Sequence, residues 1–206
     1  IPVRFHDFES LITDREIDFV EFHFSCSDLD REVPQWGELT RGLWCSAHCP
    51  EQFDNDHIID LCSSDEAYRC QSVKYVNAAL TKAKLLADQF DQDRDIPFIC
   101  NIGGMSADGF LVDSDVRERV DKLLISMSEL DLDGVNFLPQ TMPPFPWHFG
   151  GQAFHNLFVD ARSIVELCDA LGCAVCLDVS HSYLAAMHTQ VKFADFVNAI
   201  KSKVQY

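Results

Sequence analysis

Residues 173–181 read Cys-Ala-Val-Cys-Leu-Asp-Val-Ser-His, and the interpretation of the whole chain starts from them. The apolar run over residues 173–177 has the length of a strand that is buried on both faces in a parallel sheet. Asp178 stands where this strand would end, and His181 follows three residues later, in the expected turn. In parallel α/β folds, functional side chains gather at this end of the strands.

A carboxylate and an imidazole at one strand end suggest a metal site. Their oxygen and nitrogen donors suit divalent ions such as Mn, Zn, Mg or Co, so Asp178 and His181 are the candidate ligands. A structural alternative is that Asp178 caps the next helix while His181 lies on the surface. Both interpretations stay open at this point.

Four further segments have the pattern of strands, and stretches with helical spacing separate them. A helix is expected to begin at the capping box Ser63-Ser64-Asp65-Glu66, and Asp160 and Gly172 are expected to bound another. Repeated strand–helix order predicts an α/β fold with a parallel sheet, of the (β/α) TIM-barrel type. The expected strands are residues 18–24, 43–48, 97–102, 134–138 and 173–177, and the other expected helices are residues 5–16, 115–130 and 193–203.

A closed barrel needs eight strands and about 250 residues. The chain has 206 residues and about five recognisable strands. We therefore expect residues 1–206 to form a single barrel-like domain that is incomplete at its C-terminal end. The chain would then be part of a longer protein, in which an oligomer or further domains cover the exposed sheet edges.

Polar side chains stand at the ends of the first two expected strands. Glu21 and His23 are two residues apart, so they share one face of their strand. His48 ends the next strand, just before Cys49 and Pro50. An acid and two imidazoles there are candidates for a catalytic base or a substrate contact. A Glu–His pair that only bonds its neighbours is the structural alternative.

The segment after the fourth expected strand holds four prolines and three large aromatic residues between positions 139 and 152. This composition is typical of a stiff, shaped loop, and long ordered loops are usually functional. Trp147 offers a flat ring on which a ligand could stack. Candidate substrate-binding residues are Asn101, Trp147, His148 and Gln152.

Composition narrows the partners of the chain. Its net charge of −17 opposes binding to nucleic acid, because phosphates need clustered Lys and Arg. No apolar run approaches the roughly 20 residues of a membrane span. Nine cysteines, several in apolar runs, favour reduced thiols and a cytoplasmic protein. Cys173 and Cys176 would point to opposite faces of their strand, which argues against a paired redox or zinc role.

Ala47-His48-Cys49-Pro50, together with Asp178 and His181, resembles the xylose-isomerase-like, endonuclease-IV-like TIM-barrel superfamily of sugar-phosphate isomerases and epimerases. That family has a Glu where this chain reads Leu138-Pro139-Gln140-Thr141, so the resemblance makes Gln140 a neutral third ligand. The remaining family ligands would come from strands beyond Tyr206. The proline-rich loop and residues 20–24 also resemble the barrel domain joined to sialic-acid-synthase-type proteins.

The resemblance implies a metal-dependent isomerase or epimerase of a sugar or sugar phosphate. A degenerate, non-catalytic barrel that serves as a binding or assembly module is the alternative. A nuclease is disfavoured by the charge and by Asn101, which stands where the nuclease pattern has His. In either of the first two cases we expect all six strand-end residues around one cavity, namely Glu21, His23, His48, Gln140, Asp178 and His181.

Overall fold

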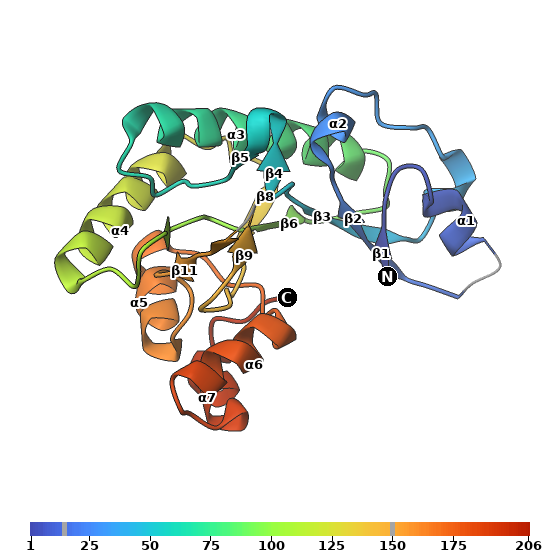
Figure 1. The fold of residues 1–206 in the computed structure, drawn as a ribbon. Coiled ribbons are helices and arrows are strands. Elements are labelled where there is room, and N and C mark those ends of the chain that lie inside the picture. The colour runs from blue at the N-terminus through green and yellow to red at the C-terminus, as the bar shows by residue number, and fades with distance from the viewer. Residues whose placement is uncertain (14–15, 149–150) are drawn as a thin grey trace. The chain divides into compact units, whose positions relative to one another are not determined.

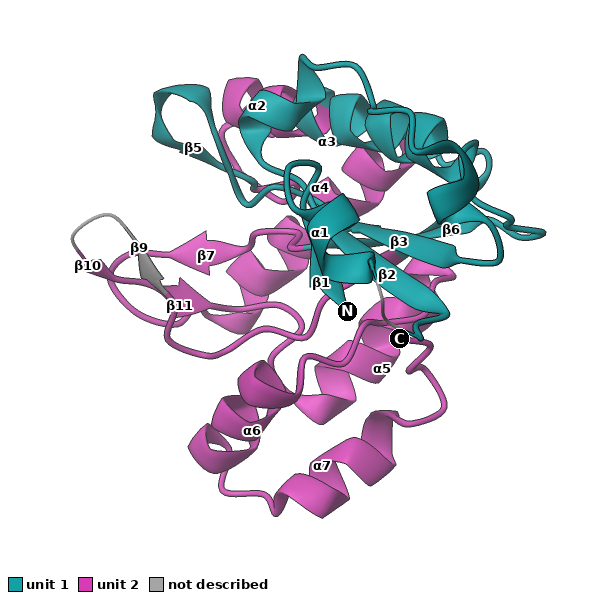
Figure 2. Cartoon of the chain, turned by 90° about the vertical axis from the view of Figure 1, so that its right-hand side faces the viewer, with its two compact units in different colours: residues 1–59, 74–100, 130–137 teal, residues 60–73, 101–129, 138–206 magenta. Residues whose placement is uncertain are grey.

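A computed structural model describes residues 1–13, 16–148 and 151–206 of the chain, except for the side chains of residues 147 and 148. Contacts divide it into two compact units (Figure 2). Unit 1 comprises residues 1–59, 74–100 and 130–137, and unit 2 comprises residues 60–73, 101–129 and 138–206. In the described part of the chain, no helix combines the length and the apolar character that crossing a membrane requires.

A parallel sheet of five strands forms the centre of unit 1 (Figure 1). Its spatial order is β1 (Pro2–Val3), β2 (Phe19–His23), β3 (Trp44–His48), β6 (Ile96–Cys100) and β8 (Val135–Pro139). The strands predicted over residues 18–24, 43–48, 97–102 and 134–138 are therefore confirmed. β1 was not predicted, because two residues are too few to show an alternating pattern.

Alternation in β2 explains how this sheet presents its side chains. Val20 and Phe22 are fully buried, whereas Phe19, Glu21 and His23 on the other face keep partial exposure. Phe22 packs with Phe8 of the short helix α1 (Phe8–Ile12), their ring centroids 5.2 Å apart. That helix is shorter than the expected 5–16. Two more short helices, α2 (Cys26–Leu29) and η1 (Gly37–Thr40), connect β2 to β3.

The segment between β3 and the next long helix contains a small hairpin. Its elements are β4 (Gln52–Phe53), η2 (Asp54–Asp56) and β5 (His57–Ile58), with β4 and β5 antiparallel. The helix itself, α3 (Glu66–Ala87), begins three residues after the predicted cap Ser63. Asp65 is the capping residue, because its Oδ1 accepts the backbone N–H groups of Ala67 and Tyr68.

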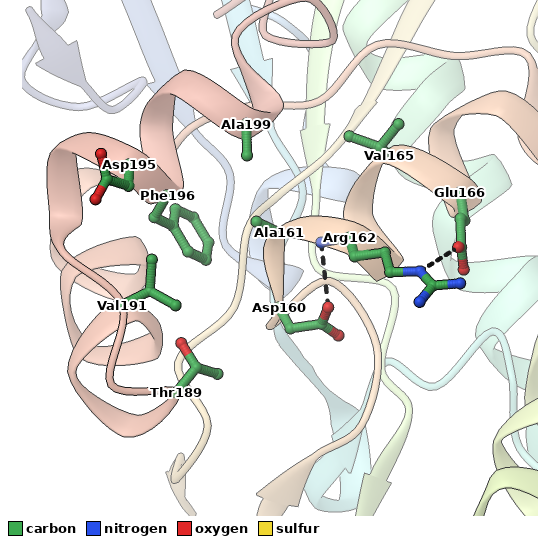
Figure 3. Close-up of a pocket in the computed structure, with 10 residues that line it drawn as sticks. All are labelled: Asp160, Ala161, Arg162, Val165, Glu166, Thr189, Val191, Asp195, Phe196 and Ala199. Carbon is green, nitrogen blue, oxygen red and sulfur yellow. Dashed lines mark hydrogen bonds and ion pairs between the residues drawn. The ribbon is translucent and has the colours of Figure 1, made fainter.

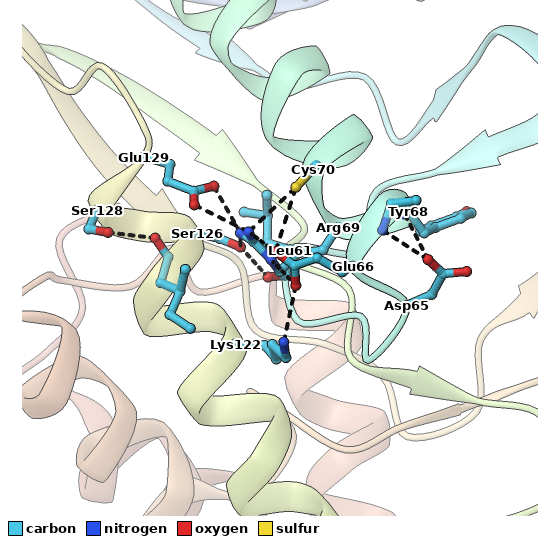
Figure 4. A network of polar contacts seen from close by, with 12 residues as sticks. Leu61, Asp65, Glu66, Tyr68, Arg69, Cys70, Lys122, Ser126, Ser128 and Glu129 are labelled. Carbon is cyan, nitrogen blue, oxygen red and sulfur yellow. Dashed lines mark hydrogen bonds and ion pairs between the residues drawn. The ribbon is translucent and has the colours of Figure 1, made fainter.

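A buried arginine holds the start of α3 to α4 (Asp113–Ser128) within unit 2 (Figure 4). Arg69 is 1% exposed and donates to Ser126 Oγ at 2.8 Å, to Glu129 Oε2 at 2.9 Å and to Glu66 Oε1 at 2.7 Å. Bonds from Arg69 and then from Lys122 lower the pKa of Glu66 to about 2. Ser126 is fully buried on the inner side of α4, whereas Leu124 is 39% exposed.

Short antiparallel pairings shape the proline-rich segment of unit 2. β9 (Trp147–His148) pairs with the next strand, β10 (Gly151–Gln152), and β11 (Phe154–His155) pairs with the distant β7 (Met105–Ser106). Asn156 secures the pairing of β7 with β11 by donating from Nδ2 to the Gly104 carbonyl at 2.9 Å and to Ser106 Oγ at 3.0 Å. The stiff, shaped loop that the prolines predict is thus present in the described residues.

Both predicted ends of α5 (Ala161–Leu171) are confirmed. Asp160 Oδ1 accepts the N–H groups of Arg162 and Ser163, and Gly172 ends the helix with φ 65°. Residues 173–177, in contrast, form no continuous strand. Only two parallel bridges occur, between Gln140 and Cys176 and between Val175 and Val204. The parallel direction is as expected, but the pairing is shorter because each bridge uses a different neighbour.

Two helices close the described chain, α6 (Val179–His188) and α7 (Phe193–Ile200). The second confirms the helix predicted over residues 193–203, three residues shorter. The first corrects the expected turn after Asp178, since His181 lies in the first turn of a helix. Within the described residues the sheet remains open, so the α/β barrel fold is present as an unclosed barrel, as the strand count predicts.

Replacing Arg69 by Ala is expected to lower the free energy of unfolding by about 2–4 kcal/mol, because it leaves a cavity and removes buried hydrogen bonds. Arg162→Ala is the matched control. Arg162 also pairs with a glutamate, Glu166, but its side chain is 88% exposed, so we expect no measurable change. Urea unfolding of both variants measures this, and equal losses would contradict the structural role of Arg69.

Candidate functional site

Unit 1 brings an acid and an imidazole into direct contact at the carboxyl end of β2. Glu21 Oε1 and His23 Nε2 are 2.6 Å apart, with side chains 20% and 37% exposed. The contact follows from strand geometry, because residues i and i+2 share a face. A carboxylate in such a short contact can take up or release a proton through the imidazole. The pair is therefore a candidate general acid–base group.

His48 joins this pair from the neighbouring strand. The parallel register sets His23 opposite His48, and their rings stack with centroids 4.9 Å apart and planes at 12°. His48 Nδ1 lies 2.9 Å from the carbonyl oxygen of Cys49. Since a carbonyl oxygen only accepts, Nδ1 carries the ring proton. Three predicted catalytic residues, Glu21, His23 and His48, thus meet in one cluster.

Unit 2 brings together the three residues predicted as metal ligands. Gln140 Nε2 donates to Asp178 Oδ2 at 3.0 Å, and His181 Nδ1 lies 3.6 Å from the same oxygen. Asp178 Oδ1 accepts the hydroxyl of Ser180 at 2.6 Å and the N–H of His181 at 2.8 Å. Asp178 therefore caps α6, as the structural alternative for this residue predicts. It also lies beside His181.

Electrostatics at Asp178 favour the carboxylate. Burial raises the pKa of its carboxyl group, but the hydrogen bonds from the backbone of His181 and from Ser180 outweigh this effect. The interaction with the His181 ring and the bond from Gln140 act in the same direction, so the pKa of Asp178 lies below its ordinary value. Asp178 accordingly offers charged oxygen atoms at neutral pH.

Thr141 organises this second group, and the sequence reading missed it. Its fully buried hydroxyl accepts the N–H of Asp178 at 3.0 Å and the hydroxyl of Ser182 at 2.9 Å. Its carbonyl oxygen accepts His181 Nδ1–H at 3.0 Å. This bond fixes the ring tautomer, as a ligand histidine requires. The position of Thr141 directly after Gln140, at the strand end, is the signal that could have found it.

The donor types here match a divalent ion only in part. Asp178 and His181 offer a carboxylate oxygen and a ring nitrogen, but the Gln140 amide nitrogen faces Asp178. Among the residues that the structure describes, no three His, Cys, Asp or Glu side chains form a group suited to a metal ion. The metal prediction for Gln140, Asp178 and His181 thus stays a prediction.

The structure describes the side chains of two of the four predicted substrate-binding residues, Asn101 and Gln152. Asn101 is 3% exposed, and its Oδ1 accepts the N–H of Gly103 at 3.0 Å, so it shapes the turn after β6. Gln152 is exposed in β10. Trp147 and His148 belong to β9, and their side chains lie outside the described residues. The expectation of one cavity for all strand-end residues also stays a prediction.

A separate cavity in unit 2 has a different character (Figure 3). It measures about 690 Å³ and lies beside α5 and α7. Of its charged lining groups, Arg162 pairs with Glu166 at 2.8 Å and Asp160 caps α5, and Asp195 is the fourth. Val165, Phe196 and Ala199 supply apolar lining. None of the predicted site residues lines this cavity, so it offers no acid–base chemistry of the expected kind.

Comparisons with known proteins place the fold. Neither a family model nor a curated protein matches the chain. Among solved structures, a D-tagatose 3-epimerase-like protein is 17% identical with a TM-score of 0.60, over 98% of this chain and 72% of that one. L-ribulose 3-epimerase is 14% identical with a TM-score of 0.65, over 100% and 68%. D-allulose 3-epimerase from Methylomonas sp. is 14% identical with a TM-score of 0.60, over 92% and 60%.

The chain has the fold of the sugar 3-epimerases. The α/β barrel fold that the sequence predicts is thus confirmed, as an unclosed barrel in the described residues. The chain spans between 60% and 72% of the length of these three epimerases. The closer resemblance to the barrel joined to sialic-acid-synthase-type proteins stays a prediction.

Thr141→Val is expected to lower the free energy of unfolding by about 1–3 kcal/mol, because the N–H of Asp178 and the hydroxyl of Ser182 lose a buried partner. Thr141→Ser keeps the hydroxyl and should cost about 1 kcal/mol or less. Urea unfolding gives both values, and amide hydrogen exchange should accelerate at Asp178 only in the valine variant. Equal exchange in the two variants would contradict the role of the hydroxyl.

Proposed function

We propose that the chain is the barrel of an isomerase or epimerase that acts on a sugar or sugar phosphate. The single observation that carries this proposal is the 2.6 Å contact between Glu21 and His23, with His48 stacked on His23. Support comes from the fold, which solved epimerases of D-tagatose, L-ribulose and D-allulose type share. This acid–base group lies at the carboxyl ends of the strands, where enzymes with this fold have their active sites.

The proposed reaction moves a proton at the carbon beside the sugar carbonyl. The Glu21 carboxylate takes that proton, and the contact with His23 lets the imidazole hold or return it. His48 presents its ring beside His23 and orients a sugar hydroxyl. Return of the proton to the same carbon on the opposite face gives the epimer, and return to the neighbouring carbon gives the isomer.

We also propose that Asp178 and His181 are the donors that this chain contributes to a divalent ion such as Mn, Zn, Mg or Co. When bound, such an ion would polarise an oxygen of the ligand that it holds. The buried Thr141 carbonyl, by accepting from Nδ1 of His181, directs the other ring nitrogen to that task.

Hydrogen–deuterium exchange of a ketose tests the proposal. The purified chain is incubated in D₂O with D-tagatose, D-allulose or L-ribulose, with and without Mn²⁺, and deuterium at the sugar carbons is followed by NMR. Glu21→Gln should reduce the exchange rate about 10²- to 10⁴-fold, because it removes the base. Glu38→Gln is the control, since Glu38 pairs only with exposed Arg41. Full exchange by Glu21→Gln would refute the role of Glu21.

A second function, a non-catalytic barrel that binds a sugar or a partner domain, is favoured by one observation. Both oxygens of Asp178 already accept hydrogen bonds, from Gln140, Ser180 and His181. For this function we expect a ketose to bind without any exchange. Isothermal titration of the same sugars separates the two, since binding without deuterium uptake identifies the binding module and measurable uptake excludes it.

A further inference from the structure

Two cysteines meet where α5 ends. The N–H of Cys173 donates to the carbonyl oxygen of Cys168 at 3.1 Å, just after the left-handed Gly172. A backbone hydrogen bond that spans six residues is typical of the Schellman motif at a helix C-terminus. In this motif the first and sixth side chains lie close together, and they are usually apolar. Here both groups are thiols, so two cysteine side chains share this helix end.

A lysine adds positive charge to this sulfur pair. Lys203 is bonded to Asp169, the residue next to Cys168, and its ammonium group acts on both thiols. A hydrogen bond with Cys173 lowers the pKa of Cys168 against the effect of burial, and Lys203 lowers it further. The same bond and burial raise the pKa of Cys173. Cys168 is therefore the more acidic of the two thiols.

Solvent access distinguishes this pair from another one in the chain. Cys173 is partly exposed and Cys168 is buried. A solute can therefore reach Cys173, whereas Cys168 is shielded from solvent. Cys49 and Cys100 are also hydrogen-bonded to each other, but both are buried. The sequence draws attention to Cys173 and Cys176, whereas the structure pairs Cys173 with Cys168.

We propose that Cys168 and Cys173 are an oxidation site at which a peroxide forms a disulfide. The Cys173 sulfur attacks one peroxide oxygen, its proton passes to Cys168, and the O–O bond breaks to leave a sulfenic acid and hydroxide. The hydroxide takes the proton from Cys168, whose thiolate then attacks the Cys173 sulfur and displaces the sulfenic hydroxyl as a second hydroxide. With proton uptake from water, two thiols and one peroxide give one disulfide and two waters.

The local geometry permits this bond. A disulfide needs α-carbons about 4.4–6.8 Å apart, and residues joined by a backbone hydrogen bond lie near that range. The ring it closes is short, so the bond removes little chain entropy and should change the stability only slightly. Its product would be a covalent link between the end of α5 and the segment that leads to Asp178.

Peptide mapping tests the proposal on the whole chain. The protein is treated with hydrogen peroxide, remaining thiols are blocked with N-ethylmaleimide, and the sample is cleaved before aspartate. Cleavage at Asp160, Asp169 and Asp178 puts Cys168 in the peptide 160–168 and Cys173 with Cys176 in the peptide 169–177. We expect these two peptides to be disulfide-linked, and dithiothreitol to separate them.

Variants identify the sulfurs. Cys173→Ser should abolish the linked peptide, whereas Cys26→Ser, at another partly exposed cysteine, should leave it unchanged. Lys203→Gln should slow its formation about 2- to 10-fold, because it removes the positive charge. Cys49 and Cys100 should stay reduced and serve as the internal control. Absence of the linked peptide in the wild-type chain, or its persistence in Cys173→Ser, would overturn the proposal.

Discussion

Parallel pairing of β2 with β3 is the constraint on which the candidate site depends. Their register runs from Phe19 opposite Trp44 to His23 opposite His48, so the two strands end together. Adjacent strands lie about 4.8 Å apart, and the two imidazole centroids are separated by 4.9 Å, which is the same spacing. The stacked histidines are thus a direct consequence of strand pairing, and Glu21 reaches His23 because alternate residues share a face.

In the group of Gln140, Asp178 and His181, the Asp178 carboxylate is both a helix cap and a candidate metal ligand. Asp178 caps α6, which satisfies backbone N–H groups that a helix start leaves open. The same carboxylate is the best oxygen donor at this strand end. A metal ion there would have to displace the Gln140 amide or the Ser180 hydroxyl from its oxygens. The two proposed functions predict different outcomes of this competition.

Local patterns were sufficient where a single element carries the information. β2 and β3 follow from alternation and from the stop at Cys49 and Pro50, and α5 follows from Asp160 and Gly172. The cap of α3 was misplaced because Ser63, Ser64 and Asp65 are all good caps, so that local preference alone does not choose among them.

Long-range contacts account for the rest. The bridges of Val175 and Cys176 depend on Val204 and Gln140, which lie far away in the sequence. The role of Thr141 rests on bonds to residues about forty positions later. Arg69 likewise takes a buried place because Ser126 and Glu129 receive its hydrogen bonds. The spacing of residues along the sequence does not reveal partners that are this far apart.

Imidazole ¹⁵N NMR of the folded chain during titration with D-tagatose tests the central claim most directly. If Glu21, His23 and His48 form a sugar site, the ring nitrogens of His23 and His48 should shift together and saturate at one concentration. His6, whose side chain is 76% exposed in the same unit, should remain unchanged. Shifts confined to His6, or none at all with D-tagatose, D-allulose and L-ribulose, would contradict the assignment of this cluster as the site.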